Sequence, residues 1–424
     1  MEVFRSRTRA SAERHERARA VFPGGETRSA AFFRPYPVHV ARADGAELID
    51  VDGNRYVDFV FNYGAVVLGH RHPAVLETAE RGLRNGISFA APGIDQIELA
   101  EELLGRLTSA ERLRFVTSGT EANITALRAA RAFTRRDVVV KAIGGFHGTI
   151  PELDRDIRGV RLPRGVPAGS AVVAVPYNDT DALVTTVRDL GERCAAVILE
   201  TVLYSGGIVP ARRWFLQAAQ EVAREVGALL ILDEVATFRL APGGHQGDLG
   251  VAPDVTTVGK IVGGGFPVGA VAGREDVMAV YDLGRADAIP HSGTYNGNPV
   301  TAAAGRAVMA RMTSNAYAQL ARRGAQLAAG LRAAIASSGA VAQISDVGSM
   351  VNIHFTDAAL ENADAVLGAS PELAAAFHLG MLDRGIFCAP RGLFLVSLAT
   401  EATHVERAVE AASQVLANIA EALA

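Results

Sequence analysis

Lysine is almost absent from this chain of 424 residues. Among 42 basic residues only two are lysine, Lys141 and Lys260, and all the others are arginine. Arginine serves wherever a positive charge is the only requirement, so a retained lysine suggests chemistry that a guanidinium cannot perform. An amine can lose its proton and attack a carbonyl carbon. We therefore regard Lys260, which lies in the glycine-rich stretch "VGKIVGGG", as a candidate nucleophile. Lys141 lies on a strand-and-turn segment without comparable motifs, and we expect an ordinary structural role for it.

Cysteine, long apolar runs and an excess of one charge are scarce as well. The two cysteines, Cys194 and Cys388, are too few for a disulfide framework and lack the spacing of metal ligands. No apolar stretch approaches the ~18 residues of a membrane span, and the amino terminus lacks the apolar region of a signal peptide. The net charge of −4 is scattered along the chain, which argues against nucleic acid or an anionic membrane as a partner. We expect a soluble, cytoplasmic protein without a metal centre.

The middle of the chain alternates between strand-like and helix-like segments. The strand-like runs are residues 113–118, 137–143, 171–177, 195–200 and 228–235. Amphipathic patterns such as 119–136 and 210–227 lie between them. This alternation is typical of a parallel sheet with helices on both faces. Parallel strands end at one edge, where such folds bind ligands, and Ser118, Glu200 and Asp233 lie at those ends.

The two ends of the chain have a different pattern. Residues 36–60 alternate as a short antiparallel meander, and helices and strands of an α+β type follow residue 300. We expect an amino-terminal segment, 1–60, that contributes to a small domain formed mainly by 306–424. The large domain would comprise residues 61–305.

A carboxylate pair ends the apolar run "LLILDEV". Asp233 would leave a buried strand there, and an unpaired buried charge is costly. One partner would be an arginine in a structural salt bridge. The other would be the ring nitrogen of a pyridine cofactor, which an aspartate keeps protonated so that the ring accepts electrons. Lys260 follows 27 residues later and could form the Schiff base that the same chemistry requires.

Two further motifs could bind such a cofactor. Ser118, Gly119 and Thr120 begin a helix, and the free N–H groups of a helix start attract phosphate, although an ordinary helix cap would have the same sequence. Phe146, in "GGFHGT", would either stack on a flat ring or fill the core.

Together these motifs resemble the class III pyridoxal-phosphate aminotransferases in order and spacing, from residue 22 to the terminal helix. The resemblance depends on SGTEA after a strand, GFHG, a glutamate that ends a strand, LDEV, TTVGKIVGGGFPVGA and HSGTYNGNP. It implies an α/β protein of fold type I, with a mostly parallel sheet in the large domain and a smaller α+β domain. It also implies pyridoxal 5'-phosphate as the cofactor.

The same resemblance implies roles for individual residues. Lys260 would hold the cofactor as a Schiff base and then move the substrate proton, and Asp233 would pair with the pyridine nitrogen. Val235 and Phe146 would lie against the two faces of the ring. Thr294 would reach the phosphate bound by the neighbouring subunit, which implies a homodimer with shared active sites. The remaining cofactor positions would be Ser118, Gly119, Thr120, Glu200 and, beside them, His147.

The sequence also indicates a branch of the family. "FPGG", "LGHRHP" and the Lys260 segment are similar to the glutamate-1-semialdehyde aminomutases. The segments 22–38, 291–305, 348–355 and 389–398 are instead similar to β-phenylalanine aminotransferases. The chain departs from the common family pattern in "DEVATF", where many members have DEVQTG, and in Thr201, where proline is usual.

Two arginines in these segments, Arg28 and Arg391, are candidate carboxylate ligands because their planar fork suits a carboxylate. Each could instead pair with a surface acid. Phe32, Phe33 and Tyr36 could enclose an aromatic group or pack in the core. We expect transfer of the amino group of an aromatic β-amino acid to 2-oxoglutarate or pyruvate. The alternatives are a glutamate-1-semialdehyde 2,1-aminomutase and an aminotransferase for another ω-amino compound. A non-enzymatic, cofactor-binding regulator is disfavoured because no DNA-binding region is present.

Overall fold

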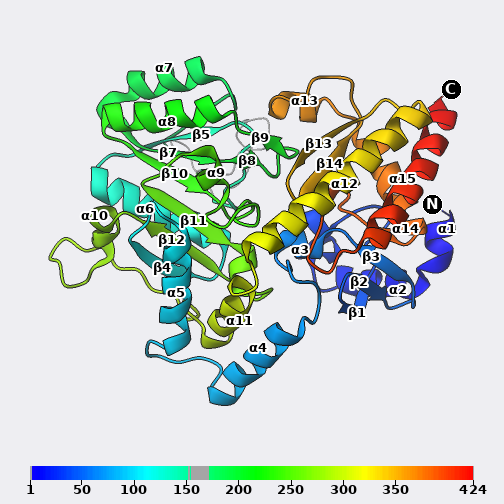
Figure 1. Ribbon diagram of the computed structural model, residues 1–424, viewed down its shortest axis with the longest axis horizontal. Helices are drawn as coiled ribbons and strands as arrows, with labels where there is room; N and C mark the ends of the chain where they lie inside the picture. Colours follow the sequence, from blue (N-terminus) through cyan, green and yellow to red (C-terminus); the bar gives the residue numbers. More distant parts are fainter. Residues whose placement is uncertain (1, 151–152, 154–170, 424) are drawn as a thin grey trace. The chain divides into compact units, whose positions relative to one another are not determined.

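A computed structural model describes residues 2–150, 153 and 171–423, and the chain forms two compact units (Figure 1). Unit 1 comprises Met1–His72, Ala318–Ala359 and Gly368–Ala424, and unit 2 comprises Pro73–Tyr317 and Leu360–Leu367. Both main boundaries fall about a dozen residues after the expected ends at 60 and 305. No helix in the described part of the chain is long and apolar enough to cross a membrane.

The described residues of unit 2 form a sheet with the strand order β4-β12-β11-β10-β7-β5-β6. The strands are β4 (Arg112–Val116), β5 (Val138–Ala142), β6 (Val172–Val175), β7 (Cys194–Glu200), β10 (Leu229–Asp233), β11 (Val255–Gly259) and β12 (Gly269–Gly273). Only β12 runs antiparallel to its neighbours, so the prediction of a mostly parallel sheet is confirmed. Neither β11 nor β12 is among the strand-like runs expected from the sequence, and the residues of β12, GAVAG, include few of the branched and aromatic side chains that mark strands.

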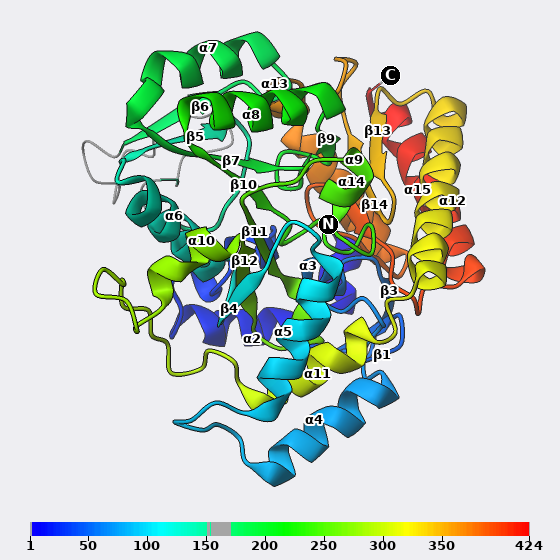
Figure 2. The ribbon, with the colours of Figure 1, turned by 60° about the vertical axis from the view of Figure 1, so that its left-hand side comes forward.

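Helices cover both faces of this sheet (Figures 1 and 2). Val197 and Leu199 of β7 pack in a cluster with α7 and α8, whereas Ala196 and Ile198 pack in a cluster with α6 and α10. The bounds are α6 (Gly119–Thr134), α7 (Thr180–Leu190), α8 (Arg213–Val226) and α10 (Glu275–Met278). Burial on both faces explains why these strands are continuous apolar runs rather than alternating patterns.

The remaining elements of unit 2 are short strands and helices. They are α4 (Pro73–Asn85), α5 (Ile94–Arg106), β8 (Val202–Leu203), β9 (Val209–Pro210), α9 (His245–Leu249), α11 (Pro299–Met309), α13 (Ala363–Leu367) and the start of α12 (Ser314–Ser338).

Unit 1 is an α+β unit with two small sheets. The first contains the expected meander, β1 (Val40–Asp44), β2 (Glu47–Asp50) and β3 (Arg55–Asp58), and adds β15 (Ile386–Phe387) parallel to β3. The second contains β13 (Gln343–Val347), β14 (Met350–His354) and β16 (Leu393–Leu395). The helices are α1 (Glu2–Arg7), α2 (Arg9–Arg19), the short turn α3 (Phe61–Gly64), α14 (Pro371–Asp383), α15 (Ala402–Leu423) and most of α12.

The charged run 6–20 in unit 1 does not form one helix, because the structure ends α1 and begins α2 on either side of Thr8. The Thr8 backbone leaves the helical region, and its hydroxyl donates to the Phe4 carbonyl oxygen at 2.6 Å. A threonine hydroxyl can compete in this way with the backbone bonds of a helix.

Candidate active site

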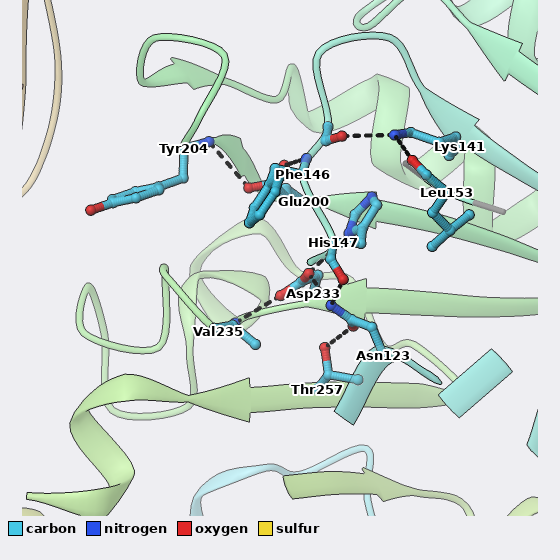
Figure 3. A network of polar contacts seen from close by, with 11 residues as sticks. Asn123, Lys141, Phe146, His147, Leu153, Glu200, Tyr204, Asp233, Val235 and Thr257 are labelled. Carbon is cyan, nitrogen blue, oxygen red and sulfur yellow. Dashed lines mark hydrogen bonds and ion pairs between the residues drawn. The ribbon is translucent and has the colours of Figure 1, made fainter. Parts of the chain in front are cut away.

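Asp233 is the centre of a buried polar network at the carboxyl edge of the sheet (Figure 3). Its Oδ2 accepts a hydrogen bond from Asn123 Nδ2 at 2.7 Å and lies 2.9 Å from His147 Nδ1. Its Oδ1 accepts from the Val235 N–H at 3.0 Å, and Thr257 Oγ1 donates to Asn123 Oδ1 at 2.7 Å. Three segments therefore fix the carboxylate, which keeps one lone pair, on Oδ1, for a further donor.

His147 is buried beside Asp233. Burial lowers the pKa of its imidazole, and the contact with Asp233 acts in the opposite direction but more weakly. Its backbone oxygen accepts from Asn123 Nδ2 at 3.0 Å. Within the described residues, its Nε2 has no hydrogen-bond partner. Such an unsatisfied buried nitrogen is costly, and a bound group could supply the missing partner.

The loop that carries Phe146 is anchored from two sides (Figure 3). Glu200 Oε2 accepts from the Phe146 N–H at 2.8 Å. The buried Lys141 donates from Nζ to the carbonyl oxygens of Gly145, at 2.8 Å, and Leu153, at 3.3 Å. The Phe146 ring is 53% exposed, so it does not fill the core. Lys141 therefore anchors the backbone of this loop, which agrees with the structural role that we expected for it.

Glu200 and Tyr204 lie near Lys260. Burial, and then the charge of Asp233, raise the pKa of Glu200 to about 8, although its two backbone donors favour the ionised form. The Nζ atom of Lys260 lies 4.6 Å from the centre of the Tyr204 ring. A cation at this distance is attracted by the face of the ring. The ring of Tyr204 and the carboxyl group of Glu200 thus both lie near the amine of Lys260.

Lys260 directly follows β11 and begins a short 3-10 turn, Lys260–Gly263. Its φ angle of 50° lies in the left-handed region, which costs a residue with a side chain roughly 1–3 kcal/mol. The turn is closely packed, because a β-carbon at Gly264 would lie 2.7 Å from the Ala304 carbonyl oxygen. The tight packing therefore holds the lysine in a conformation that it would not adopt by itself.

The start of α6 packs against the same region. Ser118 caps the helix, since its Oγ accepts from the backbone N–H three residues later at 3.1 Å. A β-carbon at Gly119 would lie 2.7 Å from Val235 Cγ1, and one at Gly148 would lie 2.2 Å from Thr120 Oγ1. The helix start thus lies beside Val235 and the Phe146 loop. The unpaired N–H groups of a helix start form a site that suits a phosphate.

Thr294 is exposed on the segment before α11 and lines a cavity of about 940 Å³ within unit 2. The lining of that cavity includes Phe89, Arg114 and His291 but none of the other predicted cofactor positions.

The two candidate substrate arginines both lie in unit 1. Arg28 Nη1 donates to Asn62 Oδ1 at 2.7 Å. Burial raises the pKa of the Tyr63 hydroxyl, and the positive charges of Arg391 and Arg28 both oppose this shift. Both guanidinium groups are therefore close enough to Tyr63 to act on its hydroxyl. Among the described residues, no carboxylate forms a salt bridge with Arg28.

Arg28, Asn62 and Tyr63 line a cavity of about 490 Å³ within unit 1. Phe33 lines it as well and also belongs to a core cluster. Phe32 and Tyr36 are outside its lining. Of the three aromatic residues considered as walls for a substrate, one therefore faces this space.

Residues 29–416 match the family model described as Aminotransferase class-III. The chain belongs to this family. It is thus a pyridoxal-phosphate-dependent enzyme of the transaminase type, which handles small-molecule amino donors and acceptors, and the predicted α/β fold is confirmed. No group of side chains that could hold a metal ion occurs among the residues the structure describes.

Relatives of this class III chain carry more than one activity in their names. The chain is 37% identical over 418 residues, 96% of its length and 99% of the relative's, to a glutamate-1-semialdehyde 2,1-aminomutase of Methanothermobacter thermautotrophicus. A β-phenylalanine aminotransferase structure from Variovorax paradoxus is 35% identical with a TM-score of 0.92, covering 97% of this chain and 94% of that one. A structure described as a transaminase with PLP bound is 32% identical with a TM-score of 0.91, covering 98% and 99%.

Sequence reasoning missed Asn123, Thr257 and Tyr204 in unit 2, and Asn62 and Tyr63 in unit 1. Asn123 could have been found, because it lies one helical turn after Gly119 and faces the same side of α6. Nothing in the local sequence marked the others, since their role depends on contacts between distant segments.

Proposed function

We propose that this chain transfers the amino group of an aromatic β-amino acid to a 2-oxo acid such as 2-oxoglutarate or pyruvate. The observation that carries the substrate assignment is Arg28, whose guanidinium lies without an acidic partner, in the described chain, beside a cavity that also has aromatic walls. A carboxylate that entered this cavity would meet a positive charge with which no carboxylate of the described residues forms a salt bridge.

The cofactor fits the residues of unit 2. Asp233 would face the ring nitrogen, and the exposed ring of Phe146 and the half-buried Val235 would cover the two faces of the cofactor. The start of α6, with Ser118, Gly119 and Thr120, would bind the phosphate. When bound, pyridoxal phosphate supplies an electron-accepting ring that stabilises negative charge on the substrate carbon.

Lys260 would attach the cofactor covalently, and its amine would also move the substrate proton. Its amine must lose a proton before it can attack a carbonyl. The Tyr204 ring would hold the charged form of the amine in place between proton transfers, at the observed 4.6 Å. Glu200 would keep the Phe146 loop and the Tyr204 backbone in position through its two backbone contacts.

Arg28 would bind the carboxylate of the amino donor, and Arg391 would bind the distal carboxylate of 2-oxoglutarate. Gly392 follows Arg391 at a φ angle of 84°, a backbone conformation that suits a turn. The aromatic group of the donor would occupy the apolar part of the unit 1 cavity, which Phe33 and Pro390 help to line.

We further propose a homodimer in which Thr294 contacts the cofactor phosphate of the other subunit. The exposure of Thr294, and its position in a cavity that none of the other predicted cofactor residues line, support this arrangement. Mixing inactive Lys260→Ala with an inactive Thr294→Trp variant should restore part of the activity through hybrid dimers. A fully active monomer in analytical ultracentrifugation would contradict the proposal.

The second candidate is isomerisation of glutamate 1-semialdehyde, which the name of the Methanothermobacter relative favours. Product analysis separates the two. With β-phenylalanine and 2-oxoglutarate the protein should form glutamate, whereas an aminomutase should convert glutamate 1-semialdehyde to 5-aminolevulinate without an acceptor. Isomerisation faster than every transamination tested would overturn the substrate assignment and leave the cofactor site unchanged.

A further inference from the structure

The turn Phe61–Gly64 in unit 1 has an unusual backbone. The φ angles of Phe61, Asn62 and Tyr63 are 46°, 51° and 55°, and that of Gly64 is 88°. Three successive residues with side chains therefore lie in the left-handed region, at a cost of roughly 1–3 kcal/mol each. Asparagine tolerates this conformation, but phenylalanine and tyrosine do so much less readily. Such a turn persists only where its surroundings fix it.

Two side chains, the buried Asp58 and the half-buried His70, fix the turn. Asp58 Oδ1 accepts from the backbone N–H groups of Val60, at 2.7 Å, and Phe61, at 3.0 Å. Its Oδ2 lies 2.8 Å from His70 Nε2, and the His70 ring stacks on the Phe61 ring at a centre distance of 5.8 Å. Asp58 and Phe61 are buried, so water does not compete for these contacts.

The turn presents its next two side chains to the segment that carries Arg28. Asn62 Oδ1 accepts from Arg28 Nη1 at 2.7 Å, and the Tyr63 hydroxyl donates to the carbonyl oxygen of Ala30. Because the Asn62 amide is neutral, it orients the guanidinium without cancelling its charge. The four guanidinium N–H groups beyond this contact, on Nε, Nη1 and Nη2, can still serve a ligand. Arg28, Asn62 and Tyr63 all line the 490 Å³ cavity.

We infer that Asn62 is a positioning residue that sets the preference for carboxylated amino donors, by holding the Arg28 guanidinium toward the unit 1 cavity. The inference rests on the proposed function, in which Arg28 binds the donor carboxylate. The strained turn provides the rigidity, and the choice of a neutral amide at position 62 preserves the positive charge.

Two substitutions keep the backbone of the turn and change only the contact. Asn62→Gly removes the amide, and glycine adopts positive φ without strain. Asn62→Asp keeps the shape, tolerates the left-handed region and adds a carboxylate that competes for Arg28. The matched donors are β-phenylalanine and 1-phenylethylamine, which lacks the carboxylate. Binding of 3-phenylpropionate, which has the ring and carboxylate but no amine, is measured on the holoenzyme by calorimetry.

Asn62→Gly should raise the KM for β-phenylalanine about 5- to 20-fold, while kcat/KM for 1-phenylethylamine changes less than about twofold. Asn62→Asp should raise the same KM about 100-fold and weaken the binding of 3-phenylpropionate to a similar extent. The reason is that the new carboxylate at position 62 pairs with Arg28 and competes with the carboxylate of the ligand. Equal losses with both donors, or an Asn62→Asp variant that binds 3-phenylpropionate as well as wild type, would overturn the inference.

Arg28→Ala separates this inference from the function on which it rests. If Arg28→Ala impairs only the carboxylated donor but both Asn62 variants behave as wild type, Arg28 binds the carboxylate and the positioning role is wrong. If Arg28→Ala impairs both donors equally, the proposed role of Arg28 fails, and the inference fails with it.

Discussion

The surroundings of Asp233 and those of Arg28 are built in opposite ways. Asp233 ends a regular strand, is 4% exposed and is held by buried partners from neighbouring elements of the sheet layer. Arg28 lies on an irregular, exposed segment and is held by one amide on a strained turn. Strand ends thus place the groups proposed to bind the cofactor, and a turn places the group proposed to select the substrate. Loss of the first should abolish chemistry, whereas loss of the second should change only the choice of substrate.

The largest effect is expected at Lys260. Lys260→Ala should lower transamination by roughly 10⁴-fold or more, because the nucleophile and the proton carrier are lost together. Mass spectrometry after borohydride reduction should find no covalent cofactor adduct. Lys141→Arg, which changes the other lysine, should retain the adduct. An adduct on Lys141 in the Lys260→Ala protein would show that the assignment is wrong.

Asp233→Asn should have the second largest effect and reduce activity roughly 100- to 1,000-fold. The ring nitrogen of the cofactor would lose the negative charge opposite it. The amide keeps the size of the side chain, so the melting temperature should change by only a few degrees. Near-native turnover would count against the pairing of Asp233 with the cofactor ring.

Arg391→Ala tests how the protein binds the 2-oxo acid acceptor. It should raise the KM for 2-oxoglutarate by about 30- to 1,000-fold, or roughly 2–4 kcal/mol for a desolvated, bidentate contact. Pyruvate has no second carboxylate and should be affected little. A similar loss with both acceptors would indicate that Arg391 supports the structure rather than the substrate.

The smallest effect concerns Glu200 and stability. Its pKa in the folded protein is raised to about 8, above the ~4.3 of an unfolded chain, so the folded state holds the proton more tightly. The free energy of unfolding should therefore fall as the pH rises from about 5 to about 8. In Glu200→Gln, denaturant titrations of the cofactor-free protein should show this fall reduced by about 1 kcal/mol or more. Glu192→Gln, a change at an exposed glutamate, is the control. If the free energy of unfolding of Glu200→Gln fell with pH as steeply as that of wild type, the raised pKa would be contradicted.

The sequence was sufficient to predict the part of the site that regular structure places. Glu200 and Asp233 could be assigned to one edge because apolar strands run directly into them, and Ser118 because a helix pattern follows its strand. Thr257 could not, since it lies inside β11 and contacts Asn123 from a distant helix. The "FNYG" turn contains two residues that disfavour positive φ, and its conformation follows from Asp58 and His70 rather than from local preference.

The most direct test of the account compares two donors in two proteins. The ratio of kcat/KM for β-phenylalanine to that for 1-phenylethylamine, with pyruvate as acceptor, isolates the contribution of the donor carboxylate. If Arg28 binds this carboxylate, the ratio should fall about 30- to 1,000-fold from wild type to Arg28→Ala, entirely through the β-amino acid. An unchanged ratio would contradict the claim that Arg28 selects the substrate.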